Sequence, residues 1–269
     1  MDVIKQYLSA GQLQEAIEHL QQELRQSPGA SDLRACLVEL LCIAGDLERA
    51  DEVLEHLAKH HQDWLAGAAN LRQLLRAQQA RLALREGKLA DDVIATPGES
   101  LEALLELNLN LSNGKTEKAR DAASALESAR AGDVFQAGES QGEIRDCDDS
   151  LNGYVEGLGT DGYYYLWQWN EIDALRFQKP SSPIELIWRR ALIELSDGRQ
   201  GEAFLPLTYA TSGTDAQKLG RETDWVEHEP QLVTGLGLKM FLVGDEAVSL
   251  EGIQDVERVE PVEAHDEAL

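Results

Sequence analysis

The sequence AGQLQEA, residues 10–16, returns as AGDLERA at residues 44–50, a shift of 34 positions. A weaker third copy, GKTEKA, occupies residues 114–119. The glycine of each copy is suited to close one helix, because glycine takes a left-handed backbone conformation without a steric penalty. The residues after it suit the start of the next helix, and the small alanine lets two helices approach closely. The repeat therefore predicts helices that pack in pairs.

Apolar residues between these turns recur at the spacing of a helix face. Stripes with i, i+3, i+4 and i+7 spacing run through residues 13–24, 33–44, 47–57 and 71–82. A helix pair every 34 residues resembles the tetratricopeptide repeat (TPR). Residues 1–132 are therefore expected to form a TPR-like αα-superhelix with a concave face. Residues 96–99, TPGE, predict a capping box with Thr96 as the N-cap, which opens one further helix.

The pattern changes after residue 130. Residues 131–150 are glycine-rich and acidic and have no helical stripe. Short runs typical of strands follow at residues 154–156, 163–167, 203–207 and 236–243, and glycines between them suit turns. Residues 182–185, SPIE, repeat the capping-box pattern and predict a helix over 186–195. We therefore expect an α+β fold with two domains: helices over 1–132, a small β-rich α+β module over 133–262, and an acidic tail at 263–269.

The charge balance restricts the class of partner. There are 24 basic and 49 acidic residues, which gives a net charge of −25. This field repels phosphate backbones and anionic lipids, so neither nucleic acid nor a membrane is an expected partner, and a basic or amphipathic protein is favoured. The amino-terminal residues lack the pattern of a signal peptide. The three cysteines show no metal-ligand spacing and indicate reduced thiols, so we expect a cytoplasmic protein.

The carboxylates Asp146, Asp148 and Asp149 are the best catalytic candidates in the sequence. Read from Asp148, the run DDSLNG matches the first positions of a calcium loop, but the final bidentate glutamate of that loop would fall on Gly159. Gly159 offers no side-chain ligand, so an acidic turn that caps nearby amides is the favoured interpretation. A hydrolase that uses Asp146, Asp148 or Asp224 stays the less favoured alternative.

Histidines give no stronger case for a cofactor. His56 and His60 are four residues apart, as in some metal sites, but the glutamate base of the zinc-protease pattern does not lie between them. The sequence also contains neither a phosphate-binding glycine loop before a helix nor a G-x-S-x-G motif. We therefore expect a protein that is not an enzyme and that needs neither a metal nor another cofactor.

Aromatic residues gather in the run YYYLWQW, residues 163–169. Strand alternation sends Tyr163, Tyr165, Trp167 and Trp169 to one face and Tyr164 to the other. One face is expected to supply the core of the β-rich module, and a partly exposed tyrosine–tryptophan face can also anchor a partner protein. Both interpretations remain open for Tyr163, Tyr165 and Trp167.

The run LGRETDW, residues 219–225, concentrates charged and aromatic residues in seven positions. Our favoured hypothesis is a structural corner, in which Arg221 and Asp224 satisfy buried polar groups and Trp225 fills the core of the β-rich module. The alternative is that Arg221, Asp224 and Trp225 contact a partner, because arginine and tryptophan are enriched at interface anchors.

The order of segments in the second half resembles the ImpE family, also called TagJ, of bacterial type VI secretion gene clusters. The segments that carry the resemblance are DDSLNG at 148–153, GYYYLW at 162–167, IELIW at 184–188, LPLTY at 205–209, LGRETDW at 219–225 and GLG at 235–237. The resemblance covers nearly the whole chain, with the TPR-like helices in front of these segments.

The resemblance implies an interaction role. Members of the family are expected to bind the small sheath subunit of the contractile apparatus through its amphipathic amino-terminal helix. This contact would link them to sheath assembly or to recycling by a ClpV-type ATPase. A leucine-lined superhelix fits such a partner, because an apolar groove can accept an amphipathic helix. The alternative is a general TPR-like scaffold or chaperone for a different client.

Overall fold

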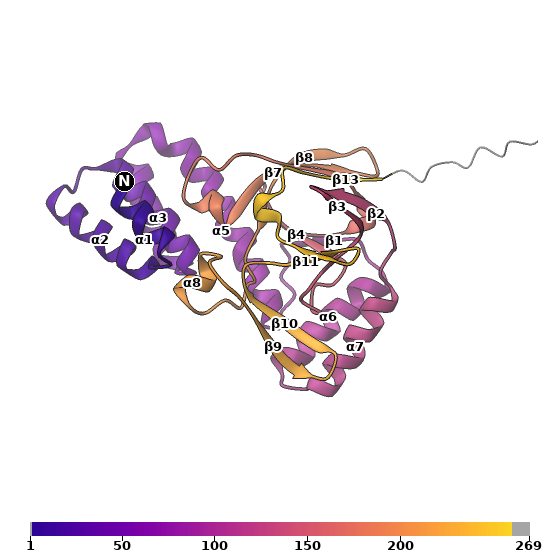
Figure 1. Ribbon diagram of the computed structural model, residues 1–269. Helices are drawn as coiled ribbons and strands as arrows, with labels where there is room; N and C mark the ends of the chain where they lie inside the picture. The colour runs from indigo at the N-terminus through magenta and orange to yellow at the C-terminus, as the bar shows by residue number, and fades with distance from the viewer. Residues whose placement is uncertain (1, 260–269) are drawn as a thin grey trace, which may run out of the picture.

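The computed structural model describes residues 2–259, in which a helical half precedes a β-rich half (Figure 1). The helices of the first half are α1 (Asp2–Ser9), α2 (Leu13–Gln26), α3 (Ser31–Ala44), α4 (Leu47–His60), α5 (Leu65–Arg85), α6 (Glu99–Ser112) and α7 (Thr116–Ser128). The α+β fold class with TPR-like helices in front is therefore confirmed. The division at residues 132 and 133 stays a prediction, and the predicted acidic tail lies outside the described residues.

The repeated glycines end helices as the sequence predicts. Gly11, Gly45 and Gly114 have φ angles of 72°, 82° and 66°, in the left-handed region that favours glycine. After Gly45, the N–H of Asp46 donates to the carbonyl of Leu41 at 3.0 Å, which is the six-to-one bond of a Schellman motif. Equivalent bonds follow the other two glycines. The 34-residue repeat is therefore a repeat of helix-closing turns.

The helix after TPGE is confirmed, but its predicted cap is wrong. The N-cap of α6 is Gly98, and it makes no side-chain capping bond. The Thr96 hydroxyl is used elsewhere, because it donates to the Glu171 carboxylate in the β-rich half. A tertiary contact has replaced the local capping bond.

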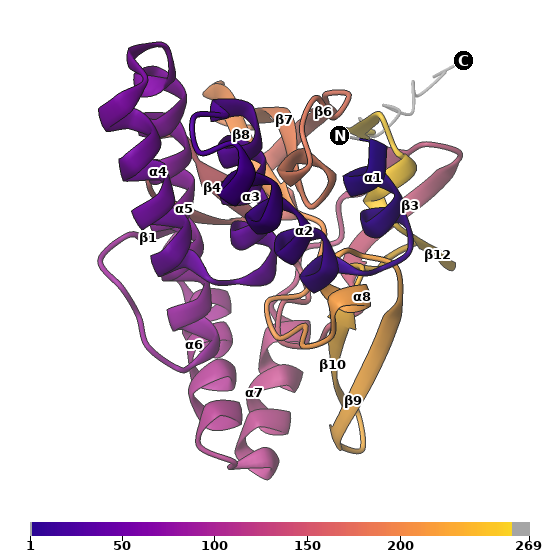
Figure 2. The ribbon, with the colours of Figure 1, turned by 90° about the vertical axis from the view of Figure 1, so that its left-hand side faces the viewer.

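Among residues 2–259, eleven strands form one sheet in the order β1-β5-β4-β8-β7-β6-β13-β2-β3-β11-β12. All neighbours are antiparallel except β1 and β5. A separate hairpin of β9 and β10 lies beside α7 (Figure 2). The strands are β1 (Val93–Ala95), β2 (Val134–Ala137), β3 (Ser140–Asp146), β4 (Tyr154–Gly159), β5 (Tyr164–Gln168), β6 (Ile172–Phe177), β7 (Trp188–Leu195), β8 (Gln200–Pro206), β9 (Thr223–Glu229), β10 (Leu232–Gly237), β11 (Phe241–Val243), β12 (Glu246–Val248) and β13 (Asp255–Arg258).

The predicted helix over 186–195 is wrong, because this segment is strand β7. The SPIE pattern starts only a short 3-10 turn, η3 (Ile184–Leu186). Ala191, Ile193 and Leu195 are buried at every second position, which is the alternation of a strand with one face in the core. The acidic segment 131–150, which shows no helical stripe, contains the whole of β2 and β3.

The β-rich half packs against the helices and covers much of their inner face. Helix α5 contacts β4 and β5, and α3 contacts η3 and the short helix α8 (Asp215–Lys218). The Glu39 carboxylate accepts the Ile184 N–H at 3.0 Å, and the Lys218 ammonium donates to the Ala44 carbonyl at 2.8 Å. The chain therefore fills part of the concave face that we expected to be open.

No helix among residues 2–259 has both the length and the apolar character needed to cross a membrane.

Candidate functional site

A cluster of buried charges joins helix α5 to the β-rich half. We call it the buried charge cluster, and it consists of Arg81, Asp146, Glu156 and Lys239. Arg81 is 2% exposed and donates to both Glu156 oxygens, from Nε at 2.8 Å and from Nη2 at 2.9 Å. The Lys239 ammonium lies 2.5 Å from Glu156 and 3.2 Å from Asp146. Two acidic and two basic side chains from distant parts of the sequence thus meet in one buried cluster.

Two tyrosines complete the hydrogen bonding of these carboxylates. The Tyr164 hydroxyl donates to Glu156 at 2.6 Å, and the Tyr209 hydroxyl donates to Asp146 at 2.9 Å. Burial raises the pKa of both phenols, so they stay protonated donors. Every oxygen of Glu156 and Asp146 therefore has a partner inside the protein.

The two carboxylates respond differently to burial. Burial opposes the ionisation of Glu156, but Arg81 and Lys239 outweigh it and hold the pKa of Glu156 well below its usual value. For Asp146 burial is the larger effect, and the pKa rises to about 6 although Lys239 opposes the rise. Glu156 is thus a firmly ionised centre, and Asp146 titrates within the range of mildly acidic solutions.

The arrangement of the buried charge cluster suits it to position helix α5 against the β-rich half. Its carboxylates are fully occupied and almost closed to solvent, at 0% for Asp146 and 2% for Glu156. A substrate would reach them only after the two halves of the chain separated. Replacement of one charged member would leave the remaining buried charges unbalanced, which favours one docking register of the two halves.

The neighbouring acidic turn caps backbone amides, as the favoured interpretation of DDSLNG predicts. Asp148 accepts the N–H groups of Ser150 at 2.8 Å and Gly235 at 3.0 Å. Asp149 accepts the N–H of Val233 at 2.7 Å. These acids thus fasten strand β10 to the turn.

An apolar groove lies among α3, α4, α5 and the segment before β7. We call it the helical groove, and its volume is about 290 Å³. It is lined by Ala35, Val38, Glu39, Leu54, Leu57, Trp64, Gly67, Ala68, Asn70, Leu71, Leu74, Ser182, Ile184, Glu185 and Phe204. Two carboxylates, Glu39 and Glu185, lie within an otherwise mostly apolar lining. Helices and the β-rich half thus line the helical groove together.

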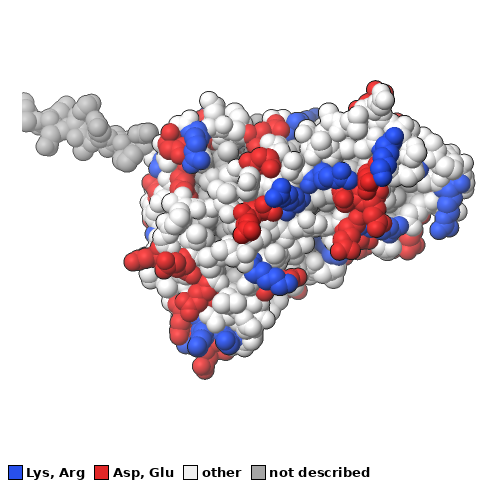
Figure 3. All heavy atoms as spheres, turned by 180° about the vertical axis from the view of Figure 1, so that it is seen from behind, with Lys and Arg blue, Asp and Glu red and all other residues white. Residues whose placement is uncertain are grey.

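A more polar groove of about 890 Å³ runs between α4 and α5. Its arginines are both paired, Arg72 with Asp51 at 2.5 Å and Arg76 with Asp92 at 2.7 Å. Figure 3 shows acidic side chains beside basic ones on the helical side of the molecule. The polar groove therefore has more acidic than basic groups, since Glu48 and Glu52 also line it.

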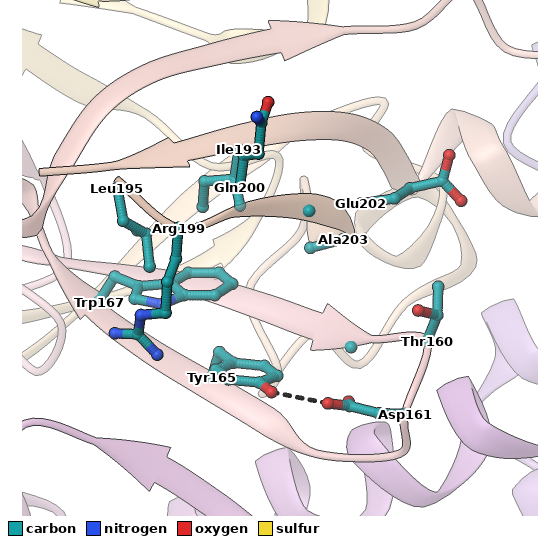
Figure 4. A pocket seen from close by; sticks show the side chains of 12 residues that line it. Thr160, Asp161, Tyr165, Trp167, Ile193, Leu195, Arg199, Gln200, Glu202 and Ala203 are labelled. Atoms are coloured by element: carbon teal, nitrogen blue, oxygen red, sulfur yellow. Dashed lines mark hydrogen bonds between the residues drawn. The ribbon is translucent and has the colours of Figure 1, made fainter. Parts of the chain in front are cut away.

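The sequence-predicted residues Tyr165 and Trp167 form one wall of a third cavity. We call it the aromatic pocket, and its volume is about 260 Å³ (Figure 4). The two rings are stacked, with centroids 4.8 Å apart and planes 9° apart. Tyr163 lies outside this stack and is 38% exposed. Trp169 belongs to the hydrophobic core of the β-rich half and is 3% exposed. The run therefore supplies both core and accessible aromatic surface.

The structural-corner hypothesis for residues 219–225 is wrong for Asp224 and Trp225, whereas Arg221 does satisfy a backbone carbonyl. Trp225 is 40% exposed and touches Tyr209 edge to face at 5.9 Å, so it does not fill a core. Asp224 is exposed and accepts the N–H of its neighbour Trp225 at 2.8 Å. Arg221 is also exposed, and its Nε donates to the Leu8 carbonyl at 3.3 Å.

The six predicted partner contacts fall into two groups. Within residues 2–259, neither a hydrogen bond nor an ion pair nor an aromatic pair joins the β5 group of Tyr163, Tyr165 and Trp167 to Arg221, Asp224 or Trp225. Asp224, an acid of the hydrolase alternative, is exposed on β9, while Asp146 is buried. Asp224 therefore does not share a cleft with Asp146.

Comparisons with known proteins assign the chain to a family. A family model described as ImpE protein matches residues 138–257, and a tetratricopeptide-repeat model matches residues 7–75. The crystal structure of protein VPA1032 from Vibrio parahaemolyticus is 36% identical in sequence and has a TM-score of 0.91, covering 96% of this chain and 98% of that one. The chain belongs to the ImpE family.

A curated ImpE-type relative matches over a similar length. The type VI secretion system accessory component TagJ of Pseudomonas aeruginosa is 26% identical over 274 residues, covering 97% of this chain and 92% of TagJ. The resemblance that the sequence motifs indicate is therefore confirmed along nearly the whole chain.

The buried charge cluster of this ImpE protein was missed at the sequence level. A signal was present, because Arg81 lies seven residues after Leu74 and four after Ala77, in phase with the buried stripe of α5. An arginine on a buried helix face requires a buried acid. The sequence does not reveal that this acid is Glu156, 75 positions away.

Proposed function

We propose that this chain is a non-enzymatic accessory component of the bacterial type VI secretion system. It acts in the cytoplasm as an adaptor that binds the small sheath subunit through the amphipathic helix of that subunit. The contact links the subunit to sheath assembly or to recycling by a ClpV-type ATPase. Support comes from the similarity to TagJ, which is named as such an accessory component, and from the TPR helices, whose architecture is typical of proteins that bind other proteins.

The helical groove is the observation that carries this proposal. An amphipathic helix binds by laying apolar side chains, spaced three or four residues apart, into an apolar groove. Leu71 of α5 lines the groove half-buried, and Leu54, Leu57 and Leu74 form its buried floor on the adjacent helices α4 and α5.

Charge favours the same kind of partner. The net charge of −25 attracts a basic helix from a distance, and the half-buried carboxylate of Glu39 lines the groove, where it can pair with a basic residue that flanks the apolar stripe of that helix. A helix with a leucine stripe and lysines or arginines beside it is therefore the expected ligand.

Gly67 offers a direct test. It lines the groove in α5, and an added Cβ would meet nothing within 4 Å. Gly67→Trp should fill the groove without disturbing the fold and should abolish co-purification of the small sheath subunit. Gly29→Trp is the matched control, because Gly29 also faces open space but lies outside the groove. If Gly67→Trp retains the sheath subunit at the level of Gly29→Trp, the groove is not the binding site.

The general-scaffold alternative predicts a different outcome of the same experiment. The protein would then co-purify with another client, the sheath subunit would be absent, and Gly67→Trp would release that client. The hydrolase alternative has less support, because Asp146 is buried with all its oxygens paired and Asp224 lies exposed on β9.

The six residues of the sequence-level site remain proposed partner contacts. Their separation into two groups favours two secondary surfaces, one at the aromatic pocket and one around Trp225 on β9. Neighbouring Val226 is 37% exposed and extends the apolar surface at Trp225. In the adaptor role, these surfaces would contact parts of the assembly other than the helix in the groove.

A further inference from the structure

The aromatic pocket has a wall that depends on two glycines. Gly157 and Gly159 of β4 leave room for the rings of the neighbouring strand β5 to lie across them. An added Cβ at Gly157 would come within 2.2 Å of Trp167, and one at Gly159 within 2.7 Å of Tyr165. The stacked rings therefore cover the backbone of β4 and expose aromatic surface to the pocket.

The other side of the pocket is aliphatic and open. Ile193, Leu195 and Ala203 of β7 and β8 line it, and Figure 4 shows them across from the two rings. Gly201 also lines the pocket, and an added Cβ there would meet nothing within 4 Å. The space between the two walls suits a slender aliphatic chain.

The charged groups at the rim leave one carboxylate without a cation. Arg199 is paired with Asp197 at 2.7 Å. Asp161 accepts the Tyr165 hydroxyl at 2.7 Å and the N–H of Tyr163 at 3.2 Å. Among residues 2–259, Asp161 makes no ion pair. A negative charge thus lies directly beside the aromatic wall.

We propose that the aromatic pocket binds a lysine or arginine side chain of a partner polypeptide. The aliphatic stem would lie between the aromatic wall and the aliphatic wall, as long basic side chains do on apolar surfaces. The cationic group would lie at Asp161 and near the ring of Tyr165, where a carboxylate and an aromatic face both attract it. The negative field of the whole protein concentrates basic segments near this opening. This inference goes beyond the helical groove and does not depend on the identity of the partner bound there.

The direct test is a titration of the full chain, labelled with ¹⁵N, with two short probes followed by NMR. The probes are acetyl-Gly-Arg-Gly-amide and acetyl-Gly-Gln-Gly-amide, which differ in the cation. The indole N–H signal of Trp167 should shift saturably with the arginine peptide and not with the glutamine peptide. Equal shifts with both peptides, or no shift with either, would overturn the proposal.

Two variants and one control distinguish binding in the aromatic pocket from a general attraction of cationic peptides to an acidic protein. Gly201→Phe should abolish the shift by filling the pocket. Asp161→Asn keeps an acceptor for Tyr165 and should weaken arginine-peptide binding about tenfold, as expected for the loss of one partly desolvated ion pair. Asp245→Asn removes the same charge from an exposed turn and should leave binding unchanged. If Asp245→Asn weakens binding of the arginine peptide as much as Asp161→Asn does, the proposal is contradicted. Tighter binding of free spermidine than of the peptide would also contradict it, since the pocket would then serve small amines.

Discussion

Glu156 is the residue on which the junction of the two halves most depends. It accepts hydrogen bonds from Arg81 and Tyr164 and lies 2.5 Å from the Lys239 ammonium. Buried charges are costly to leave alone, so each member of the buried charge cluster is needed once the others are present. The cluster therefore contributes specificity of docking, in addition to whatever stability it adds.

Glu156→Gln should destabilise the protein strongly. The change removes the negative charge between two buried cations, and loss of one partner of a buried ion pair typically costs about 3–5 kcal/mol. Chemical denaturation followed by circular dichroism measures the free energy of unfolding. Glu55→Gln is the control, because Glu55 is an exposed acid paired with Lys59 on α4, and its replacement should change stability far less. Equal effects of the two changes would show that the buried charge cluster does not hold the halves together.

Asp146 should make the protein less stable as the pH rises from about 4 to about 6. Burial raises the pKa of Asp146 from 3.8 to about 6, so the folded protein holds this proton more tightly than the unfolded chain does. The resulting stabilisation is complete below the usual pKa and is lost as the pH rises through the folded value. Measured against Asp146→Asn, the wild-type free energy of unfolding should therefore decline across this window. If the free energies of unfolding of the wild type and of Asp146→Asn change with pH in the same way, the raised pKa of Asp146 is contradicted.

The sequence predicts the burial and pairing of some residues but not of others. Alternation in the run at 163–169 could not separate core from surface, because exposed Tyr163 and buried Trp167 share one predicted face and Tyr164 on the other face is buried as well. Nor could the sequence predict that Trp225 is exposed, because the sequence of a hairpin does not say whether another element covers it. Arg81 could have been recognised from its phase on α5, whereas its partner Glu156 depends on a contact between distant segments.

At the scale of elements, local signals located the early helices and strands β4, β5 and β8, but they failed for β7. The helix-closing glycines and leucine stripes act within a few residues, so the sequence alone is enough to locate α2 to α4. Strand β7 was predicted as a helix, because SPIE resembles a helix start while the decisive influence is pairing with β6 and β8. Pairing partners that lie elsewhere in the chain are not visible in a local pattern.

Gly45 and Gly67 should respond in opposite directions to alanine. Gly45 has a φ of 82°, so Gly45→Ala should cost about 1–2 kcal/mol through backbone strain, although its Cβ would meet nothing within 4 Å. Gly67 is inside α5, where Gly67→Ala should stabilise the protein by about 1 kcal/mol. Urea denaturation of both variants measures the difference. If both changes destabilise equally, the left-handed turn is not the reason for glycine at position 45.

At the scale of the whole molecule, the β-rich half occupies part of the TPR face that a partner would otherwise use. Helices and the β-rich half line the helical groove together, and the β-rich half supplies its Ile184 and Phe204. This arrangement could not be predicted from the sequence, since the Glu39–Ile184 contact joins residues 145 positions apart. The ImpE fold thus combines a helical repeat and a β-rich module in one surface.

The central claim is that the helical groove binds the amphipathic helix of the small sheath subunit. Hydrogen–deuterium exchange of the full chain, with and without that subunit, tests it most directly. We predict slower amide exchange in α3, α4, α5 and residues 182–185 on binding, and unchanged exchange in the Gly67→Trp variant. Protection confined to the β-rich strands, or slower exchange in α3 to α5 of the Gly67→Trp variant as well, would contradict the account.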